Sequence, residues 1–82
     1  MKLKALIVED ENSLLELLKF NFLKDGFKVD TATDGEIALE KILYKPPDLL
    51  ILDWMLPKLS GIELCRRIRK NKEIKNLPII ML

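Results

Sequence analysis

Short apolar runs alternate with segments of helical periodicity along this chain. Residues 5–8 and 49–52 are continuous apolar runs, which is typical of strands that are covered on both faces of a sheet. Residues 27–31 instead alternate between less polar and charged positions, which predicts a half-exposed edge strand. Residues 78–82, of which the first is a proline, begin a fourth strand. We therefore expect the first two runs to form the central pair of a sheet.

Three segments between these runs carry apolar residues at the spacing of an α-helix. The first has the form of a capping box, with Ser13 as the N-cap and Glu16 as the third helical residue, and it stops at residues 25–26. The second opens at residues 34–35 and ends at the prolines 46–47, and the third follows a loop punctuated by proline and glycine. The faces expected to be buried are Leu15, Leu18 and Phe22 with Leu14 and Leu17 beside them; Ala38, Leu39, Ile42 and Leu43; and Ile62, Cys65 and Ile68.

The resulting order of elements is β-α-β-α-β-α-β. Strands that alternate with helices of about 10–15 residues predict an α/β fold with a parallel sheet and right-handed crossovers. The chain has 82 residues, which allows one small domain, and no repeat, linker or low-complexity segment divides it.

Composition excludes several classes of function. Fourteen basic residues against thirteen acidic ones leave a net charge of +1, so the segment has no general electrostatic attraction for nucleic acid or anionic lipid. Histidine is absent, which excludes imidazole bases and ligands. Cys65 is the only cysteine and is expected to be a core thiol, which fits a reducing cytoplasm. The apolar run 5–8 is too short for a signal segment or a membrane span.

Acidic residues follow both predicted central strands. Glu9 and Asp10 come after the first strand, and Asp53 comes after the third. The carboxyl ends of parallel strands meet at one edge, where two carboxylates about 4 Å apart repel by about 4 kcal/mol at an effective dielectric of about 20. A hard cation such as Mg²⁺ would relieve that repulsion. On the residues alone two interpretations stay open: a metal or phosphoryl site, or solvent-facing acids that also favour the start of a helix.

The motifs in this order resemble a known family. Residues 8–11 (Val-Glu-Asp-Glu), Asp34-Gly35 with Ala38-Leu39, and residues 48–57 followed by Ser60-Gly61 resemble the receiver domain of bacterial two-component response regulators. The segment 52–57, Leu-Asp-Trp-Met-Leu-Pro, is most similar to the PhoB-like class with a winged-helix output domain. The resemblance covers residues 3–82 and implies a flavodoxin-like fold, with strand order 2-1-3-4-5 in a complete receiver.

The resemblance also implies the chemistry. Asp53 would be the phosphoacceptor, attacking a phosphohistidine on a sensor histidine kinase. Asp10 and Asp53 would ligate Mg²⁺ directly, the backbone carbonyl of Met55 would be a third protein ligand, and Glu9 would act mostly through a water. A carboxylate is a weak nucleophile, and Mg²⁺ would make transfer feasible by neutralising the phosphoryl oxygens. The chain would then be a phosphorylated switch that regulates an output, expected to be transcription, rather than a metabolic enzyme.

Other interpretations are weaker. A nucleotide-binding enzyme would need a glycine-rich phosphate loop after the first strand, and the sequence has none. A pseudo-receiver that binds partners without taking phosphate would usually have lost Asp53 or the first-strand acids, which are both present. The basic run 66–70 is expected to be a solvated helix face rather than a nucleic-acid surface. The leucines of the first helix are expected to be core, although the family docks its kinase near that helix. DNA binding would belong to a C-terminal domain outside these residues.

The sequence also departs from a complete receiver. The family has about five βα units, and residues 1–82 reach only the fourth strand. The hydroxyl residue after that strand, the lysine after the fifth strand and the aromatic switch residue on it all lie outside this sequence. The fourth strand is therefore expected to form an unpaired apolar edge, and we hypothesise a fragment that forms a swapped or edge-strand dimer or folds poorly.

Overall fold

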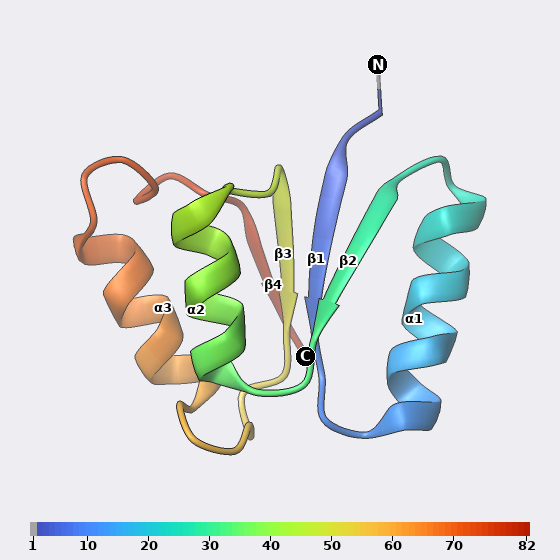
Figure 1. Cartoon of the computed structure of the whole chain (residues 1–82), viewed down its shortest axis with the longest axis horizontal. Coiled ribbons are helices and arrows are strands. Elements are labelled where there is room, and N and C mark those ends of the chain that lie inside the picture. Colours follow the sequence, from blue (N-terminus) through green and yellow to red (C-terminus); the bar gives the residue numbers. More distant parts are fainter. Residues whose placement is uncertain (1) are drawn as a thin grey trace.

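The computed structural model describes residues 2–82, and it is a single parallel sheet with helices on both faces (Figure 1). The elements, in chain order, are β1 (Lys4–Val8), α1 (Asn12–Lys24), β2 (Lys28–Ala32), α2 (Gly35–Tyr44), β3 (Leu49–Leu52), α3 (Gly61–Lys70) and β4 (Ile79–Met81). The predicted order of elements is confirmed. The strand order is β2-β1-β3-β4, so β1 and β3, which contain the two continuous apolar runs, are the central pair, as predicted.

The core has two layers because successive strand side chains point to opposite faces of the sheet. Helix α1 covers one face and α2 with α3 covers the other (Figure 1). The α1 side holds a buried cluster of Ala5, Ile7, Leu15 and Ile51. The opposite side holds the larger cluster of Leu6, Val8, Ala32, Ala38, Ile42, Leu50, Leu52, Leu59, Leu64, Ile68, Ile74 and Leu77. Both central strands are thus covered on both faces, which explains why residues 5–8 and 49–52 are all apolar.

Helix α1 begins two residues earlier than predicted. Its N-cap is Glu11, whose carboxylate accepts hydrogen bonds from the backbone N–H of Ser13 (3.2 Å) and of Leu14 (2.6 Å). The prediction of Ser13 as the N-cap is wrong because the helix already starts at Asn12, so the Glu11 side chain caps the unpaired N–H groups of the first turn and Ser13 lies inside that turn. Asp34 and Ser60 cap α2 and α3 in the same way.

The buried faces of α2 and α3 differ in part from the prediction. Ile62 is 46% exposed and Leu64 is fully buried, so the inward stripe of α3 is Leu64 and Ile68, with Cys65 partly buried beside it. Residues four apart share a helix face, whereas residues two apart lie on opposite sides, which is why Ile62 points outward once Leu64 points inward. In α2, Ala38 and Ile42 are buried as predicted, and Leu43 is 54% exposed.

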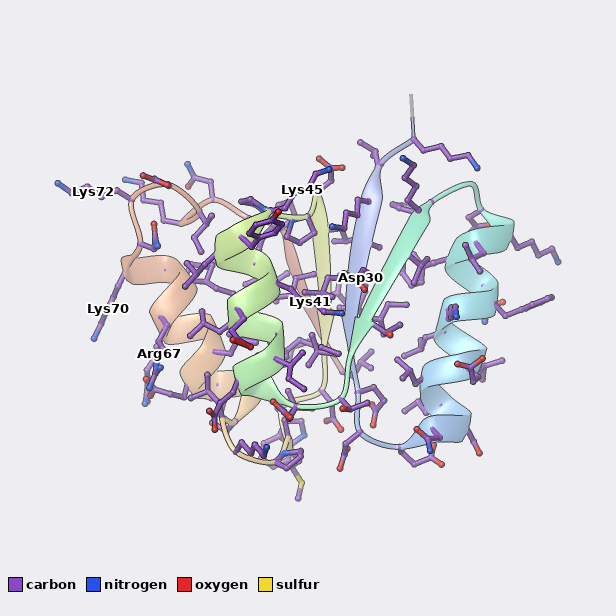
Figure 2. All side chains as sticks on the ribbon, in the orientation of Figure 1. Asp30, Lys41, Lys45, Arg67, Lys70 and Lys72 are labelled. Carbon is purple, nitrogen blue, oxygen red and sulfur yellow. The ribbon has the colours of Figure 1, made fainter. Side chains whose placement is uncertain are left out.

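The two outer strands have different environments. Strand β2 is an edge strand as predicted, and an ion pair between Asp30 and Lys41 links it to α2 (Figure 2). Strand β4 pairs with β3, and Ile80 and Met81 on it are exposed. The expectation of a swapped or edge-strand dimer through β4 stays a prediction. No helix within residues 2–82 is long and apolar enough to cross a membrane.

Candidate functional site

The ends of β1 and β3 place the predicted acidic residues side by side. Val8 is in register with Leu52, so Glu9 and Asp53 each follow the last paired residue of their strand. Backbone hydrogen bonds continue to this point: the N–H of Asp53 donates to the Val8 carbonyl at 3.1 Å, and the N–H of Glu9 donates to the Ala32 carbonyl at 3.1 Å. Main-chain pairing therefore fixes both residues at the carboxyl edge of the sheet.

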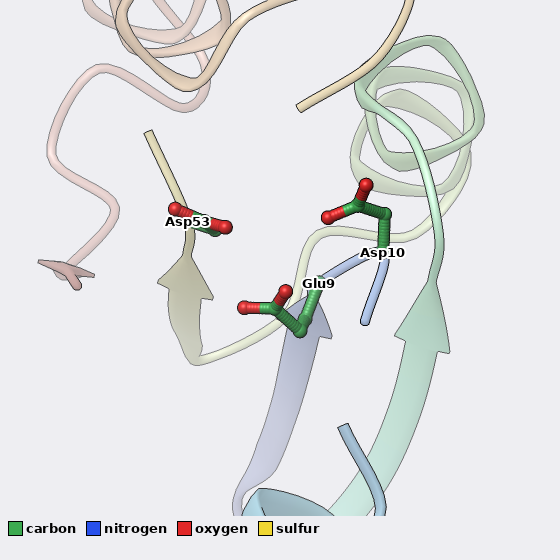
Figure 3. Close-up of side chains that lie close together, drawn as sticks. All are labelled: Glu9, Asp10 and Asp53. Carbon is green, nitrogen blue, oxygen red and sulfur yellow. The ribbon is translucent and has the colours of Figure 1, made fainter. Parts of the chain in front are cut away.

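Three carboxylates converge at this edge (Figure 3). Glu9, Asp10 and Asp53 each offer one oxygen atom, and these oxygen atoms all lie within 4.8 Å of one another. Glu9 is buried, Asp53 is half-buried and Asp10 is exposed, so the group opens from the sheet edge toward solvent. Among the ion pairs of residues 2–82, none involves these three carboxylates. The cluster thus concentrates negative charge without a side-chain cation.

Glu9 is the most unusual of the three groups. Its Oε2 accepts a hydrogen bond from the N–H of Glu11 at 3.1 Å, while its Oε1 is buried and has no hydrogen-bond partner within the described chain. Burial raises the pKa of Glu9, and the charges of Asp53, Asp10 and Glu11 raise it further, against the opposing effect of the Glu11 hydrogen bond. A buried carboxylate oxygen without a partner is costly, and a cation or a cation-bound water would satisfy it.

Asp53 is held by the loop that follows it. Its Oδ1 accepts a hydrogen bond from the N–H of Met55 at 3.2 Å, which fixes the orientation of the carboxylate. Met55 therefore borders the cluster through its backbone, while its side chain is 65% exposed. Trp54 is half-exposed beside Asp53. All four residues singled out from the sequence, namely Glu9, Asp10, Asp53 and Met55, are brought together at one edge of the sheet.

Sequence reasoning missed the contact between the start of α2 and this loop. The N–H of Gly35 donates to the carbonyl of Pro57 at 3.4 Å, and Lys58 Nζ lies 3.9 Å from Asp34 Oδ2. The available signal was the position of Asp34-Gly35 after β2, because parallel strands end at a common edge. The unusual backbone conformation at Lys58, by contrast, has no signature in the residue type.

Comparison with proteins of known sequence identifies close relatives. The chain is 54% identical over 79 residues to the phosphate regulon transcriptional regulatory protein PhoB of Rhizobium meliloti. It is 49% identical over 82 residues to the alkaline phosphatase synthesis transcriptional regulatory protein PhoP of Bacillus subtilis. These alignments cover 96% and 100% of this chain but only 35% and 33% of the relatives. The chain therefore spans about a third of their length.

Solved structures share the same fold. A response regulator from Chloroflexus aurantiacus superposes with a TM-score of 0.96 at 38% identity, over 99% of this chain and 66% of that one. The receiver domain of the sensor histidine kinase PA1611 from Pseudomonas aeruginosa superposes with a TM-score of 0.93 at 26% identity, with the same coverage. That structure contains a magnesium ion in its active-site cleft.

The sequence family described as the response regulator receiver domain matches residues 5–82. This match covers nearly the whole chain and includes every residue of the acidic cluster. The parallel sheet in the order β2-β1-β3-β4 is the flavodoxin-like arrangement expected from the resemblance. The chain therefore belongs to the response regulator receiver domain family.

Proposed function

We propose that this chain accepts a phosphoryl group on Asp53 from a sensor histidine kinase, with Mg²⁺ held at the acidic cluster. The observation that carries the proposal is the convergence of Glu9, Asp10 and Asp53 around a buried, unpartnered Glu9 oxygen. Mutual repulsion among these groups favours a cation, and their all-oxygen donor set suits a hard divalent ion. The magnesium ion in the cleft of the PA1611 receiver supports the choice of metal.

The proposed ligand roles are those that the family resemblance implies, and the proximity of the three carboxylates supports them. Asp10 and Asp53 would bind Mg²⁺ directly, Glu9 would act mostly through a water, and the Met55 carbonyl would complete the protein ligands. When bound, the ion supplies neutralisation of the negative charge on the phosphoryl oxygens. The protein residues position the carboxylates. The N–H of Met55 holds the Asp53 carboxylate in one orientation, and burial of Glu9 anchors the cluster to the end of β1.

The transfer itself uses the Asp53 carboxylate as the nucleophile. One of its oxygens forms a bond to phosphorus while the bond between phosphorus and the histidine nitrogen of the kinase breaks. The imidazole leaves with the bonding electron pair and takes a proton from solvent, and the product is an acyl phosphate on Asp53. The chain would therefore promote its own phosphorylation rather than convert a metabolite.

The names of the relatives suggest which process the whole protein regulates. PhoB and PhoP are named as transcriptional regulatory proteins, and both are about three times as long as this chain. We therefore propose that the whole protein regulates transcription from the cytoplasm through a DNA-binding region outside residues 1–82. The near-neutral charge of this segment fits a signalling role better than direct DNA contact.

The test combines metal binding with phosphorylation. Trp54, the only tryptophan, lies next to Asp53, so its fluorescence should change saturably as Mg²⁺ is added. Acetyl phosphate with Mg²⁺ should then add one alkali-labile phosphoryl group, measured by intact mass. Asp53→Asn should weaken the fluorescence response and abolish the modification, whereas Asp25→Asn, a matched change at the far end of α1, should alter neither. A folded chain that binds Mg²⁺ but is never phosphorylated would instead be a pseudo-receiver.

A further inference from the structure

The loop that follows Asp53 contains a strained turn at Lys58. Its φ of 67° lies in the left-handed region, and no other non-glycine residue between 2 and 82 has a positive φ. The N–H of Leu59 donates to the carbonyl of Pro57 at 2.7 Å, which closes a three-residue turn around Lys58. A turn of this kind with a positive central φ is rare and costly, so neighbouring structure must hold it in place.

The start of α2 supplies the contacts that hold this turn. The N–H of Gly35 donates to the same Pro57 carbonyl, at 3.4 Å. The neighbouring Asp34 is buried, and its two carboxylate oxygens have separate partners: Oδ1 accepts from the N–H of Ile37 at 2.9 Å, and Oδ2 faces Lys58 Nζ at 3.9 Å. The N-cap residue of α2 and the first residue of the helix therefore both contact the strained turn.

Gly35 also leaves no space for a side chain. A Cβ at this position would stand 2.7 Å from the Leu59 Cβ and 2.8 Å from the Leu59 carbonyl carbon. Leu59 is 8% exposed and belongs to the larger core cluster, so it cannot move outward without opening the core. The close approach of α2 to the loop thus depends on the absence of a side chain at Gly35.

We propose that Asp34 and Gly35 are positioning residues for the acidic cluster. Within residues 2–82, no hydrogen bond or ion pair joins either residue to the three carboxylates. They act through the loop: they fix the turn at Lys58, and this sets the path of the backbone that carries Met55. The other end of the loop is already fixed, because the N–H of Gly61 donates to the Trp54 carbonyl at 3.0 Å. The effect on metal affinity rests on the proposed function, because it requires that Mg²⁺ binds at the acidic cluster. Metal affinity depends strongly on the groups that orient the ligands.

The main test is Gly35→Ala in the full chain, with Gly26→Ala as its matched control. Gly26 has a φ of 92° and no atom within 4 Å of a Cβ built there, so alanine strains the backbone at a distance from the loop. Amide NMR without metal is expected to show shifted resonances for Asp53 and Met55 in Gly35→Ala alone. The Mg²⁺ affinity, followed by Trp54 fluorescence, is expected to fall about tenfold in Gly35→Ala and to stay unchanged in Gly26→Ala.

The outcomes separate this inference from the proposed function. If the unmodified chain binds no Mg²⁺, the proposed metal site fails, while the metal-free amide shifts still decide whether Gly35 positions the loop. If Gly35→Ala folds and both its amide resonances and its affinity match the unmodified chain, the positioning role is refuted.

A second pair of variants covers the case in which Gly35→Ala does not fold. Lys58→Pro fixes the φ of residue 58 at about −65° and forces the turn to change, whereas Lys58→Gly adopts the positive φ without strain. The proline variant is expected to reproduce the Met55 shift and the weaker Mg²⁺ affinity, and the glycine variant, which keeps the turn but loses the ion pair to Asp34, is expected to show smaller changes than the proline variant. An unchanged site in Lys58→Pro would overturn the proposal.

Discussion

Gly61 packs directly against the backbone of Asp53. A Cβ at Gly61 would stand 2.5 Å from the Asp53 carbonyl oxygen and 2.6 Å from the Trp54 Cα, distances that real Cβ atoms do not adopt. The first residue of α3 therefore lies against the two residues that follow β3, so the two ends of the loop are in contact. This contact links the start of a helix to the orientation of the proposed phosphoacceptor.

Gly61→Ala is expected to disturb both stability and the site. The added methyl group meets backbone atoms that cannot rotate away, so the free energy of unfolding should fall by about 1–3 kcal/mol, as for other overpacked positions. The Mg²⁺ affinity should fall as well, because the Asp53 backbone must shift. Urea unfolding and Trp54 fluorescence measure the two effects.

Ser60→Ala is the matched control for Gly61→Ala. It removes the N-cap hydrogen bond to the N–H of Glu63 and should cost about 1 kcal/mol, without adding an atom near Asp53. The Mg²⁺ affinity of this variant should stay close to that of the unmodified chain. Equal affinities for both variants would contradict the role assigned to the Gly61 contact.

Glu9→Gln is expected to stabilise the metal-free chain while weakening the metal site. Burial and the neighbouring carboxylates disfavour the charged form of Glu9 and raise its pKa, so a neutral amide removes a cost of folding. The gain should lie between about 1 and about 4 kcal/mol, the size of one like-charge contact at about 4 Å in water and at an effective dielectric of about 20. Urea unfolding with and without Mg²⁺ measures it, and the order of stabilities should reverse when the ion is present. A loss of stability without metal would contradict this prediction, because it would show that the ionised Glu9 carboxylate stabilises the metal-free chain.

Asp30→Asn is expected to remove a pH-dependent contribution to stability. Burial alone would raise the pKa of Asp30, but the hydrogen bonds from Lys41 and the Thr31 N–H, together with the Lys41 charge, lower it overall. A lowered pKa in the folded state stabilises the protein above the ordinary value of 3.8, and this contribution disappears as the pH falls through the lowered value. Because both side chains are more than a third exposed, the effect at neutral pH should be only about 0.5 kcal/mol.

Urea unfolding at pH 7 and near pH 2.5 checks this prediction. The difference in stability between Asp30→Asn and the unmodified chain should be present at pH 7 and should shrink in acid. Asp25→Asn, at the C-cap of α1, removes the same charge at another place and controls for the change in net charge. A difference that stays constant across this range would exclude the ion pair with Lys41 as its source.

The sequence predicted the sheet and the acidic cluster well because both follow from simple periodicity. Continuous apolar runs mark β1 and β3 as central strands, and a parallel pair necessarily ends at one edge. The meeting of Asp10 and Asp53 at that edge is therefore a consequence of topology alone. Their roles in binding Mg²⁺ and accepting phosphate stay predictions, because those roles came from the family resemblance.

Details that depend on tertiary packing could not be predicted in the same way. Ser13 and Glu11 both offer a capping oxygen, and the choice between them depends on where the extended segment after β1 turns. The strained turn at Lys58 is imposed by contacts with Asp34 and Gly35, which lie far away in the sequence. A local pattern contains neither kind of information.

The rotation of α3 gives the clearest test of the corrected core. Leu64 is fully buried against the sheet, so Leu64→Ala should leave a cavity and cost about 3 kcal/mol, a large part of the stability of a small domain. Ile62 is 46% exposed, and Ile62→Ala should cost less than about 1 kcal/mol. Both changes replace a large aliphatic residue with alanine within the same helix, so helix propensity does not explain the difference. Urea unfolding measures both losses of stability. A larger loss for Ile62→Ala than for Leu64→Ala would contradict the structure and support the inward face predicted from the sequence, which includes Ile62.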